Sequence, residues 1–477
     1  MKKLRKILIV FVLVIISCVG LISGCQATLK GGPNKNDAIT SNGKLVVQKG
    51  NYLYFVNGYV SASSNNKAGK VDNGAIYRVK LTNNKLSYDE NGNLLDCERV
   101  VSKIAGFENG GIYIFGNTLY YASPNTEKNR SDGKVDTNLL DFYKVNLNGS
   151  GNSRIYKSTV SSSSTQFAFY EIDKTVYLVV YDTEKVVVVN CSNSKQTIVS
   201  ENVSSAILPV VENNNPANNT ISNVESRVYY TRSAKDGEEN TGKVMCYASI
   251  NNAGKEVVVS GLNSSLSYNL KQLSYSSNED NAYIVYTTSE TGAELYYASK
   301  IVNEEIDMSS QIKLTTKAQS NNVYLYTDNS AFNSQKGIIT TNANSYLTLI
   351  TLSNNYIEKS TVYENLGKIT ILDVKGNVVF YKNENNQVFM VELNNEELTP
   401  IQLTNSDNTY NFDAKVNFDI NGEYVYIYKT YTGDNDSNGN AVTGNYLIRV
   451  KYQNTSSYEE ELVGKVLAKH IKTETEE

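Results

Sequence analysis

Residues 165–200 read TQFAFYEIDKTVYLVVYDTEKVVVVNCSNSKQTIVS. This stretch contains four short runs rich in valine, tyrosine, phenylalanine and isoleucine, with polar residues between them: TQFAFYE, TVYLVVYD, KVVVVNC and KQTIVS. Runs of this length and composition, bounded by turn-forming residues, are typical of β-strands. The stretch therefore predicts one unit of four consecutive strands.

The same order of runs recurs along the chain, and we count eight copies. The copies cover 44–103, 110–158, 165–200, 226–260, 282–316, 323–364, 368–404 and 414–467. A repeat of four short strands in about 50 residues is typical of a β-propeller blade, which completes its burial only by stacking on its neighbours. The sequence predicts an all-β protein, a β-propeller with eight blades favoured. Seven blades with one decorated copy, and two separate β domains, are the alternatives.

Copy 323–364 has the least certain register. We mark the second run of each copy by one residue. The shortest interval between markers and one of the two longest adjoin the sixth copy, and the other long interval separates the first two copies. The markers are Leu53, Leu119, Val176, Val228, Ala282, Tyr346, Val378 and Tyr424.

The strands are apolar on both faces. In Tyr52-Leu53-Tyr54-Phe55-Val56 successive side chains point to opposite sides of the sheet, yet all five are apolar or aromatic. A sheet with one face in water would alternate with polar residues, so both faces must be covered. The chain has 36 tyrosines and no tryptophan, and tyrosine suits strand positions that bury a ring and leave the hydroxyl near a polar group.

Composition excludes several classes of function. The chain has 45 basic and 49 acidic residues, so it lacks the positive surface that nucleic acids require. It has one histidine, His470, which argues against histidine metal clusters and serine or cysteine nucleophiles that need a histidine base. No glycine-rich phosphate loop is present, so we expect no nucleotide and no cofactor.

Residues 4–25, LRKILIVFVLVIISCVGLISGC, have the order of an export signal. A basic start precedes an apolar segment at 7–16 that is shorter than the roughly 18–20 residues needed to span a bilayer. Ile22, Ser23, Gly24 and Cys25 resemble the lipobox of bacterial lipoproteins. That resemblance implies cleavage before Cys25, lipidation of its thiol, and anchoring to the outer face of the bacterial cell membrane.

The repeats resemble bacterial propellers of the TolB-like kind and Firmicute-type surface lipoproteins whose repeats read LYRVNLDG. Residues 141–150, DFYKVNLNGS, carry the resemblance well, and residues 75–81, AIYRVKL, carry it moderately. The likeness covers about residues 44–465. It implies the propeller fold and says little about catalytic or binding residues.

We therefore divide the chain into four parts: a lipoprotein signal peptide at 1–24, a lipidated flexible tether at 25–43, the propeller at 44–465, and a charged tail at 466–477. Three further cysteines, Cys97, Cys191 and Cys246, lack metal-ligand spacing. We expect small core residues, with one disulfide as the alternative.

A weak calcium site is the one metal candidate. Asp434, Asp436 and Asn438 place oxygen ligands at alternate positions, as in the opening of an EF-hand loop. The twelfth position is Asn445 instead of the usual glutamate, which favours an ordinary hairpin loop.

Four long loops fall at the same point of their copies, between the second and third runs, at 61–73, 124–138, 233–242 and 430–444. Equivalent insertions of a propeller gather on one rim, where a partner can bind. We expect a non-enzymatic, membrane-anchored lipoprotein that binds or scaffolds a protein, peptide or glycan through these loops. The alternatives are a glycan hydrolase or lyase with two carboxylates, and a subunit of a membrane-associated envelope assembly.

Overall fold

The computed structural model describes the chain in segments. The described residues are 28–58, 74–105, 111–125, 139–161, 166–182, 184–209, 226–275, 282–290, 293–302, 305–315, 323–327, 336–353, 356–393, 398–405, 410, 418–435 and 441–464.

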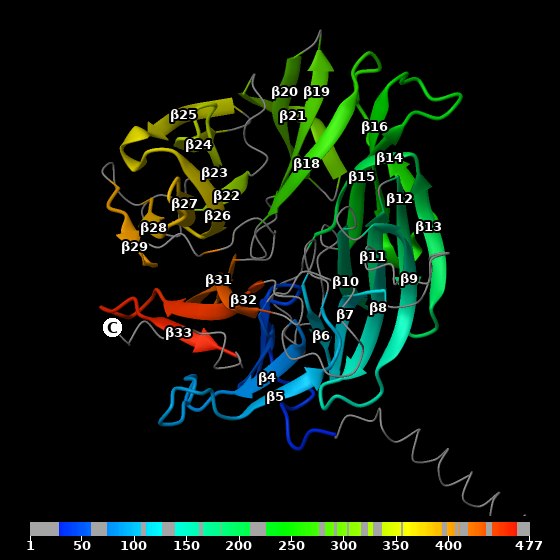
Figure 1. Ribbon diagram of the computed structural model, residues 1–477. Helices are drawn as coiled ribbons and strands as arrows, with labels where there is room; N and C mark the ends of the chain where they lie inside the picture. Colours follow the sequence, from blue (N-terminus) through cyan, green and yellow to red (C-terminus); the bar gives the residue numbers. More distant parts are fainter. Residues whose placement is uncertain are drawn as a thin grey trace, which may run out of the picture.

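These residues form eight antiparallel sheets that follow one another around a ring, each built from consecutive strands. In Figure 1 the colours run around the molecule from blue to red, and the red sheet returns beside the blue one. First strands of neighbouring sheets contact each other, as between β2 and β30 or β18 and β22. We call the sheets blades 1–8 and their four strands A–D, with strand A nearest the axis.

Blades 1 and 2 contain β2 (Val46–Lys49), β3 (Tyr52–Val56), β4 (Ile76–Lys80), β5 (Cys97–Val101), β6 (Tyr113–Phe115), β7 (Thr118–Pro124), β8 (Leu139–Asn146) and β9 (Ser153–Ser161). Blades 3 and 4 contain β10 (Gln166–Ile172), β11 (Thr175–Asp182), β12 (Lys185–Asn190), β13 (Lys195–Glu201), β14 (Val203–Ile207), β15 (Arg227–Ser233), β16 (Lys243–Ser249) and β17 (Glu256–Val258).

Blades 5 and 6 contain β18 (Tyr268–Tyr275), β19 (Ala282–Glu290), β20 (Ala293–Val302), β21 (Glu305–Thr315), β22 (Tyr324–Thr327), β23 (Lys336–Thr341), β24 (Leu347–Ser353) and β25 (Tyr356–Tyr363). Blades 7 and 8 contain β26 (Ile369–Lys375), β27 (Val378–Asn383), β28 (Val388–Glu392), β29 (Ile401–Gln402), β30 (Phe418–Asn421), β31 (Tyr424–Asn435), β32 (Ala441–Lys451) and β33 (Glu460–Val463). Blade 1 gains a fifth strand, β1 (Ile39–Thr40), and two short 3₁₀ turns, η2 (Ile250–Asn252) and η3 (Glu364–Leu366), complete the described elements.

The prediction of an eight-bladed propeller is confirmed, and each copy read from the sequence corresponds to one blade. One marker was wrong. Tyr346 directly precedes β24, the third strand of blade 6, whereas the second strand is β23. The uneven intervals around the sixth copy follow from that marker lying one strand too late.

The core lies between the blades. The apolar clusters join blade 8 to 1 and 2, blade 2 to 3 and 4, and then each following pair of neighbours round to blade 8. Tyr54, Tyr121, Tyr229 and Tyr426 are buried in these layers. Both faces of β3 are covered, as its apolar sequence predicts.

Hydrogen bonds close the ring between blade 8 and blade 1. Asn421 on β30 accepts from Thr40 Oγ1 and donates to the carbonyl of Val46, and the Tyr428 hydroxyl donates to the carbonyl of Val56. Each described sheet contains only consecutive strands. Packing and these bonds therefore join the first and last blades, without a strand exchanged between them.

Alternation of antiparallel strands gives the ring two different faces. The turns from strand A to B and from C to D lie on one side, which we call the AB face. The loops from B to C and the links from D to the next A lie on the other, which we call the BC face. The loops singled out in the sequence all fall between a strand B and a strand C, so their strand ends meet the BC face, as expected. The loop expected at 430–444 is wrong in extent, because β31 continues to Asn435 and β32 begins at Ala441, and cross-strand pairing makes most of this range a β-hairpin.

Residues 28–43 contact the ring, although the sequence suggested a flexible tether there. Leu29 N–H donates to the carbonyl of Asn148 in the β8–β9 turn, and Ile39 and Thr40 pair with β2. Asn42 then exchanges two hydrogen bonds with the backbone of Ile114 on β6. The segment thus crosses the AB face and enters the axis, where it forms the inner edge of blade 1 (dark blue in Figure 1).

Candidate functional site

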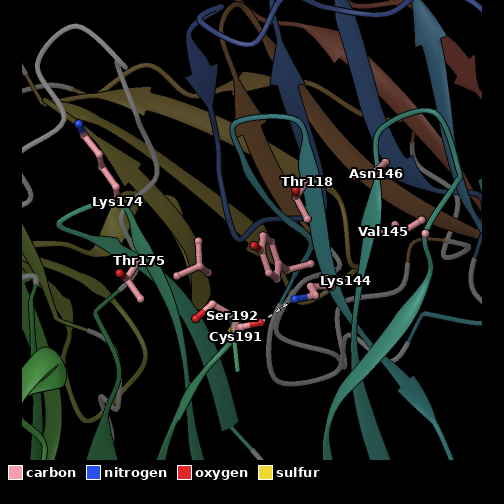
Figure 2. A pocket seen from close by; sticks show the side chains of 11 residues that line it. Thr118, Lys144, Val145, Asn146, Lys174, Thr175, Cys191 and Ser192 are labelled. Carbon is pink, nitrogen blue, oxygen red and sulfur yellow. Dashed lines mark hydrogen bonds between the residues drawn. The ribbon is translucent and has the colours of Figure 1, made fainter. Parts of the chain in front are cut away.

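An open cavity of about 300 Å³ lies between blades 2 and 3 on the AB face. Blade 2 contributes the start of β7 and the end of β8, and blade 3 contributes the β10–β11 and β12–β13 turns. The lining residues are Thr118, Tyr120, Lys144, Val145, Asn146, Gly151, Lys174, Thr175, Val176, Cys191 and Ser192. Figure 2 shows side chains from both blades gathered around this cavity.

Lys144 is the half-buried cation of this cavity. Its Nζ donates to the carbonyl of Cys191 at 2.8 Å, which links the two blades (Figure 2). The Tyr120 ring is buried beside it, and burial raises the pKa of its hydroxyl. Lys174 is exposed at the β10–β11 turn. The lining therefore offers two ammonium groups and no carboxylate.

A charged cluster fixes the described BC loop of blade 4, residues 234–242. The buried guanidinium of Arg232 donates to Glu238 in the loop at 2.7 Å and to Glu256 on β17 at 2.6 Å. Lys235 Nζ also donates to Glu256, and so does the Tyr230 hydroxyl. Because Arg232 has two acidic partners on different elements, it ties the loop to the outer edge of its blade.

The same cluster excludes one catalytic role. Hydrogen bonds from Arg232 hold the pKa of Glu238 at about 2. Burial opposes ionisation of Glu256, but hydrogen bonds from Arg232, Lys235 and Tyr230 outweigh it and its pKa is also about 2. Both carboxyls are ionised at neutral pH, so neither suits a general acid.

The cysteines occupy core positions. Cys97, Cys191 and Cys246 are buried in blades 1, 3 and 4. Burial raises the pKa of the Cys191 and Cys246 thiols to about 12. A thiolate is the nucleophilic form, so these two thiols are unreactive in the folded ring.

Most of the sequence-predicted site residues lie outside the described part of the chain. This holds for the lipobox residues Ile22, Ser23 and Gly24, for Cys25, and for Asp436 and Asn438 of the calcium candidate. Asp434 lies near the end of β31. Within the described ranges, no group of three or more histidine, cysteine, aspartate or glutamate side chains could hold a metal ion, and no helix could cross a membrane.

Sequence reasoning missed Lys144 and Arg232. Lys144 belongs to the repeated phrase DFYKVNLNGS, which had been interpreted as a shape motif. Comparing the cation of that phrase between copies would have singled it out. Arg232 had no such signal, because its partners come from a loop and from the outermost strand.

The ring of eight antiparallel sheets, each built from consecutive strands, defines this chain as a β-propeller protein. No protein-family model and no curated protein matches the chain. Among solved structures it is similar to dipeptidyl peptidase 4 of Porphyromonas gingivalis, at 9% identity and a TM-score of 0.46 over 90% of this chain and 59% of that one. It is also similar to a prolyl endopeptidase, at 12% identity and a TM-score of 0.41 over 74% of this chain and 48% of that one.

A third similar structure is TolB of Acinetobacter baumannii, at 11% identity and a TM-score of 0.29 over 74% of this chain and 80% of that one. The chain spans about half the length of the two peptidases. All three likenesses concern the fold alone.

Proposed function

We propose that this protein is a non-enzymatic lipoprotein on the outer face of the bacterial cell membrane, which binds a protein, peptide or glycan through its BC face. The observation that carries the proposal is the placement of the four long loops. They fall at the same B-to-C position of blades 1, 2, 4 and 8, where blade 8 carries the long β31–β32 hairpin, so the strand ends that flank them all meet one side of the ring. Loops on a rigid scaffold are where binding residues concentrate.

The path of residues 28–38 supports an orientation for the ring. Lys49 Nζ donates to the carbonyls of Lys35 and Asp37, and Leu29 is bonded to the β8–β9 turn. These contacts keep the segment on the AB face, opposite the long loops. Cys25 precedes Leu29 by four residues, and four residues span at most about 14 Å.

Lipid on Cys25 would therefore hold the AB face close to the bilayer and direct the BC face outward. Two acyl chains are enough for stable anchoring. Docking of residues 28–43 on the ring would also have a functional use. It leaves only a short free tether, and a ring on a short tether cannot turn over relative to the membrane.

The ordered BC loop of blade 4 illustrates what such a surface offers. Asp236 and Glu239 are exposed there, while Arg232 and Glu238 hold the loop backbone in place. A fixed loop loses less conformational freedom when it binds a partner than a loose one.

Site-specific crosslinking tests the proposal. A photo-crosslinking residue placed at Asp236 on the BC face should yield one dominant crosslinked product in intact cells, and the yield should fall when the neighbouring loops 61–73 and 124–138 are shortened while loop 234–242 is kept. The same residue at Gln453, exposed between β32 and β33 on the AB face and outside the cavity between blades 2 and 3, is the matched control. Equal products from both positions, or products indifferent to loop shortening, would count against the proposal.

A further inference from the structure

Blades 1, 2 and 8 carry a cation at one equivalent position on strand C. Arg78 pairs across the sheet with Tyr54, Lys144 with Tyr120, and Arg449 with Tyr426. In each blade the tyrosine is the third residue of strand B. The three cations are therefore register equivalents, and their surroundings can be compared directly.

In blades 1 and 8 this cation is neutralised by a glutamate from strand D. Arg78 bonds Glu98 at 2.7 Å, and Arg449 bonds Glu461 at 2.7 Å. The cross-strand partner of Lys144 on strand D is Ser153. Blade 2 therefore has the cation without the strand D carboxylate.

A second difference lies at the start of strand B. Tyr52 lies under the Arg78 guanidinium at 5.2 Å, and Tyr424 lies under that of Arg449 at 3.9 Å. Blade 2 has Thr118 at this position. A small hydroxyl side chain replaces an aromatic ring, and the open cavity lies there.

The groove beside Arg78 shows what such a position can hold. Arg78 Nη1 donates to the carbonyl of Gly31 at 3.0 Å, and Nη2 donates to that of Lys30 at 2.8 Å. On the far side, Leu29 N–H bonds the carbonyl of Asn148 in blade 2. A stretch of the chain's own backbone is thus held between blades 1 and 2.

The groove between blades 2 and 3 has the same construction. Lys144 corresponds to Arg78, and the β12–β13 turn with Cys191 and Ser192 corresponds to the β8–β9 turn with Asn148. Of the three N–H bonds of the Lys144 ammonium, one donates to Cys191. The other two can serve a ligand in the cavity.

From this geometry we propose that the cavity between blades 2 and 3 binds a short extended peptide with a carboxylate side chain. The ligand carboxylate binds the Lys144 ammonium, as Glu98 binds Arg78 and Glu461 binds Arg449. Lys174 is a second cation at the rim of the cavity. The peptide backbone follows the β12–β13 turn as residues 29–31 follow the β8–β9 turn. A volume of about 300 Å³ suits a short segment.

This site goes beyond the proposed function, because it lies on the AB face and uses none of the long loops. Its failure would leave binding at the BC face untouched, and loop shortening should leave this site intact.

Calorimetric titration of the full chain with acetyl-Gly-Gly-Glu-Gly-amide tests the proposal, with the glutamine analogue as matched ligand. We expect saturable binding of the glutamate peptide, and binding of the glutamine peptide about tenfold weaker or more, because a charge-assisted bond is lost. Sodium glucuronate is a third probe, and should bind more weakly than the glutamate peptide because it lacks the peptide backbone.

Two variants locate the binding. Ser153→Glu combined with Thr118→Tyr installs the residues of blades 1 and 8, and should abolish binding while the ring stays folded. Lys195→Met, an exposed lysine on β13 outside the cavity lining, should bind like the wild type. Equal affinity for the two peptides, tighter binding of glucuronate, or full binding by the Ser153→Glu, Thr118→Tyr variant would overturn the proposal.

Discussion

Arg78 and Lys144 occupy the same register position in neighbouring blades, but they hold different things. Arg78 binds Glu98 and two backbone carbonyls of the segment that enters the ring. Lys144 binds one carbonyl of the next blade, beside an open cavity. The cation at this position thus binds residues 30 and 31 in the groove between blades 1 and 2. In the groove between blades 2 and 3 the equivalent cation lies beside an open cavity that can hold a ligand.

Replacing Arg78 by methionine should loosen residues 28–38. The change removes the bonds to the carbonyls of Lys30 and Gly31, and hydrogen bonds to charged groups contribute about 1.5–3 kcal/mol each. We expect a loss of about 3 kcal/mol or more in the free energy of unfolding and faster tryptic cleavage after Lys30 and Lys35.

Lys144→Met is the matched control for that change, since it removes one carbonyl bond at the equivalent position. It should cost about 1.5 kcal/mol, half as much as the loss of two such bonds, and leave the tryptic cleavage unchanged. Equal sensitivity of the two variants would contradict the assigned role of Arg78.

Asn421→Ala should weaken the closure of the ring. The buried amide is bonded to Thr40 and to the carbonyl of Val46, and alanine leaves that carbonyl without this donor. We expect a loss of about 1–3 kcal/mol in urea unfolding. Asn193→Ala, at an exposed turn, is the control; a loss of similar size there would refute the specific role of Asn421.

Gly111→Ala should displace the segment inside the axis. A Cβ at this position would meet the backbone carbonyls of Gly43 and Lys44, which cannot swing away as a flexible side chain can. Overpacking of this kind costs about 1–3 kcal/mol. Gly254→Ala has open space around the new methyl group and should be neutral or slightly stabilising. Calorimetric melting of both variants checks the difference.

The Arg232 cluster should make stability fall in acid. Glu238 and Glu256 have a pKa of about 2 in the folded chain and about 4.5 when unfolded. Their stabilisation is complete above about pH 4.5 and is lost as the pH falls toward 2. Wild type should therefore lose more stability between pH 5 and pH 2.5 than a Glu238→Gln, Glu256→Gln variant. Parallel pH curves from chemical unfolding would contradict this role.

Strand periodicity was enough to predict the ring. Each blade is buried on both faces, so most of its strands are apolar at successive positions, and this pattern can be recognised in the sequence. The first strands of two blades were weaker signals: β14 reads VSSAI and β18 reads YNLKQLSY. Polar residues dilute the apolar pattern in both strands, so the fourth and fifth copies were recognised from their later strands.

The docking of residues 28–43 was not predictable from that pattern. The segment is polar, and it is held by backbone carbonyls that accept from Arg78 and Lys49. Backbone acceptors are the same in every residue, so they leave no mark in composition. The cavity beside Lys144 needed the register of three blades, which only the strand pairing provides.

The distance of each face from the bilayer tests the central claim most directly. The lipidated protein is reconstituted in vesicles that contain a headgroup quencher, with a fluorophore on Asp236→Cys of the BC face or on Asn193→Cys of the AB face. The account predicts strong quenching at position 193 and weak quenching at position 236. Equal quenching at both positions, or stronger quenching at 236, would contradict it.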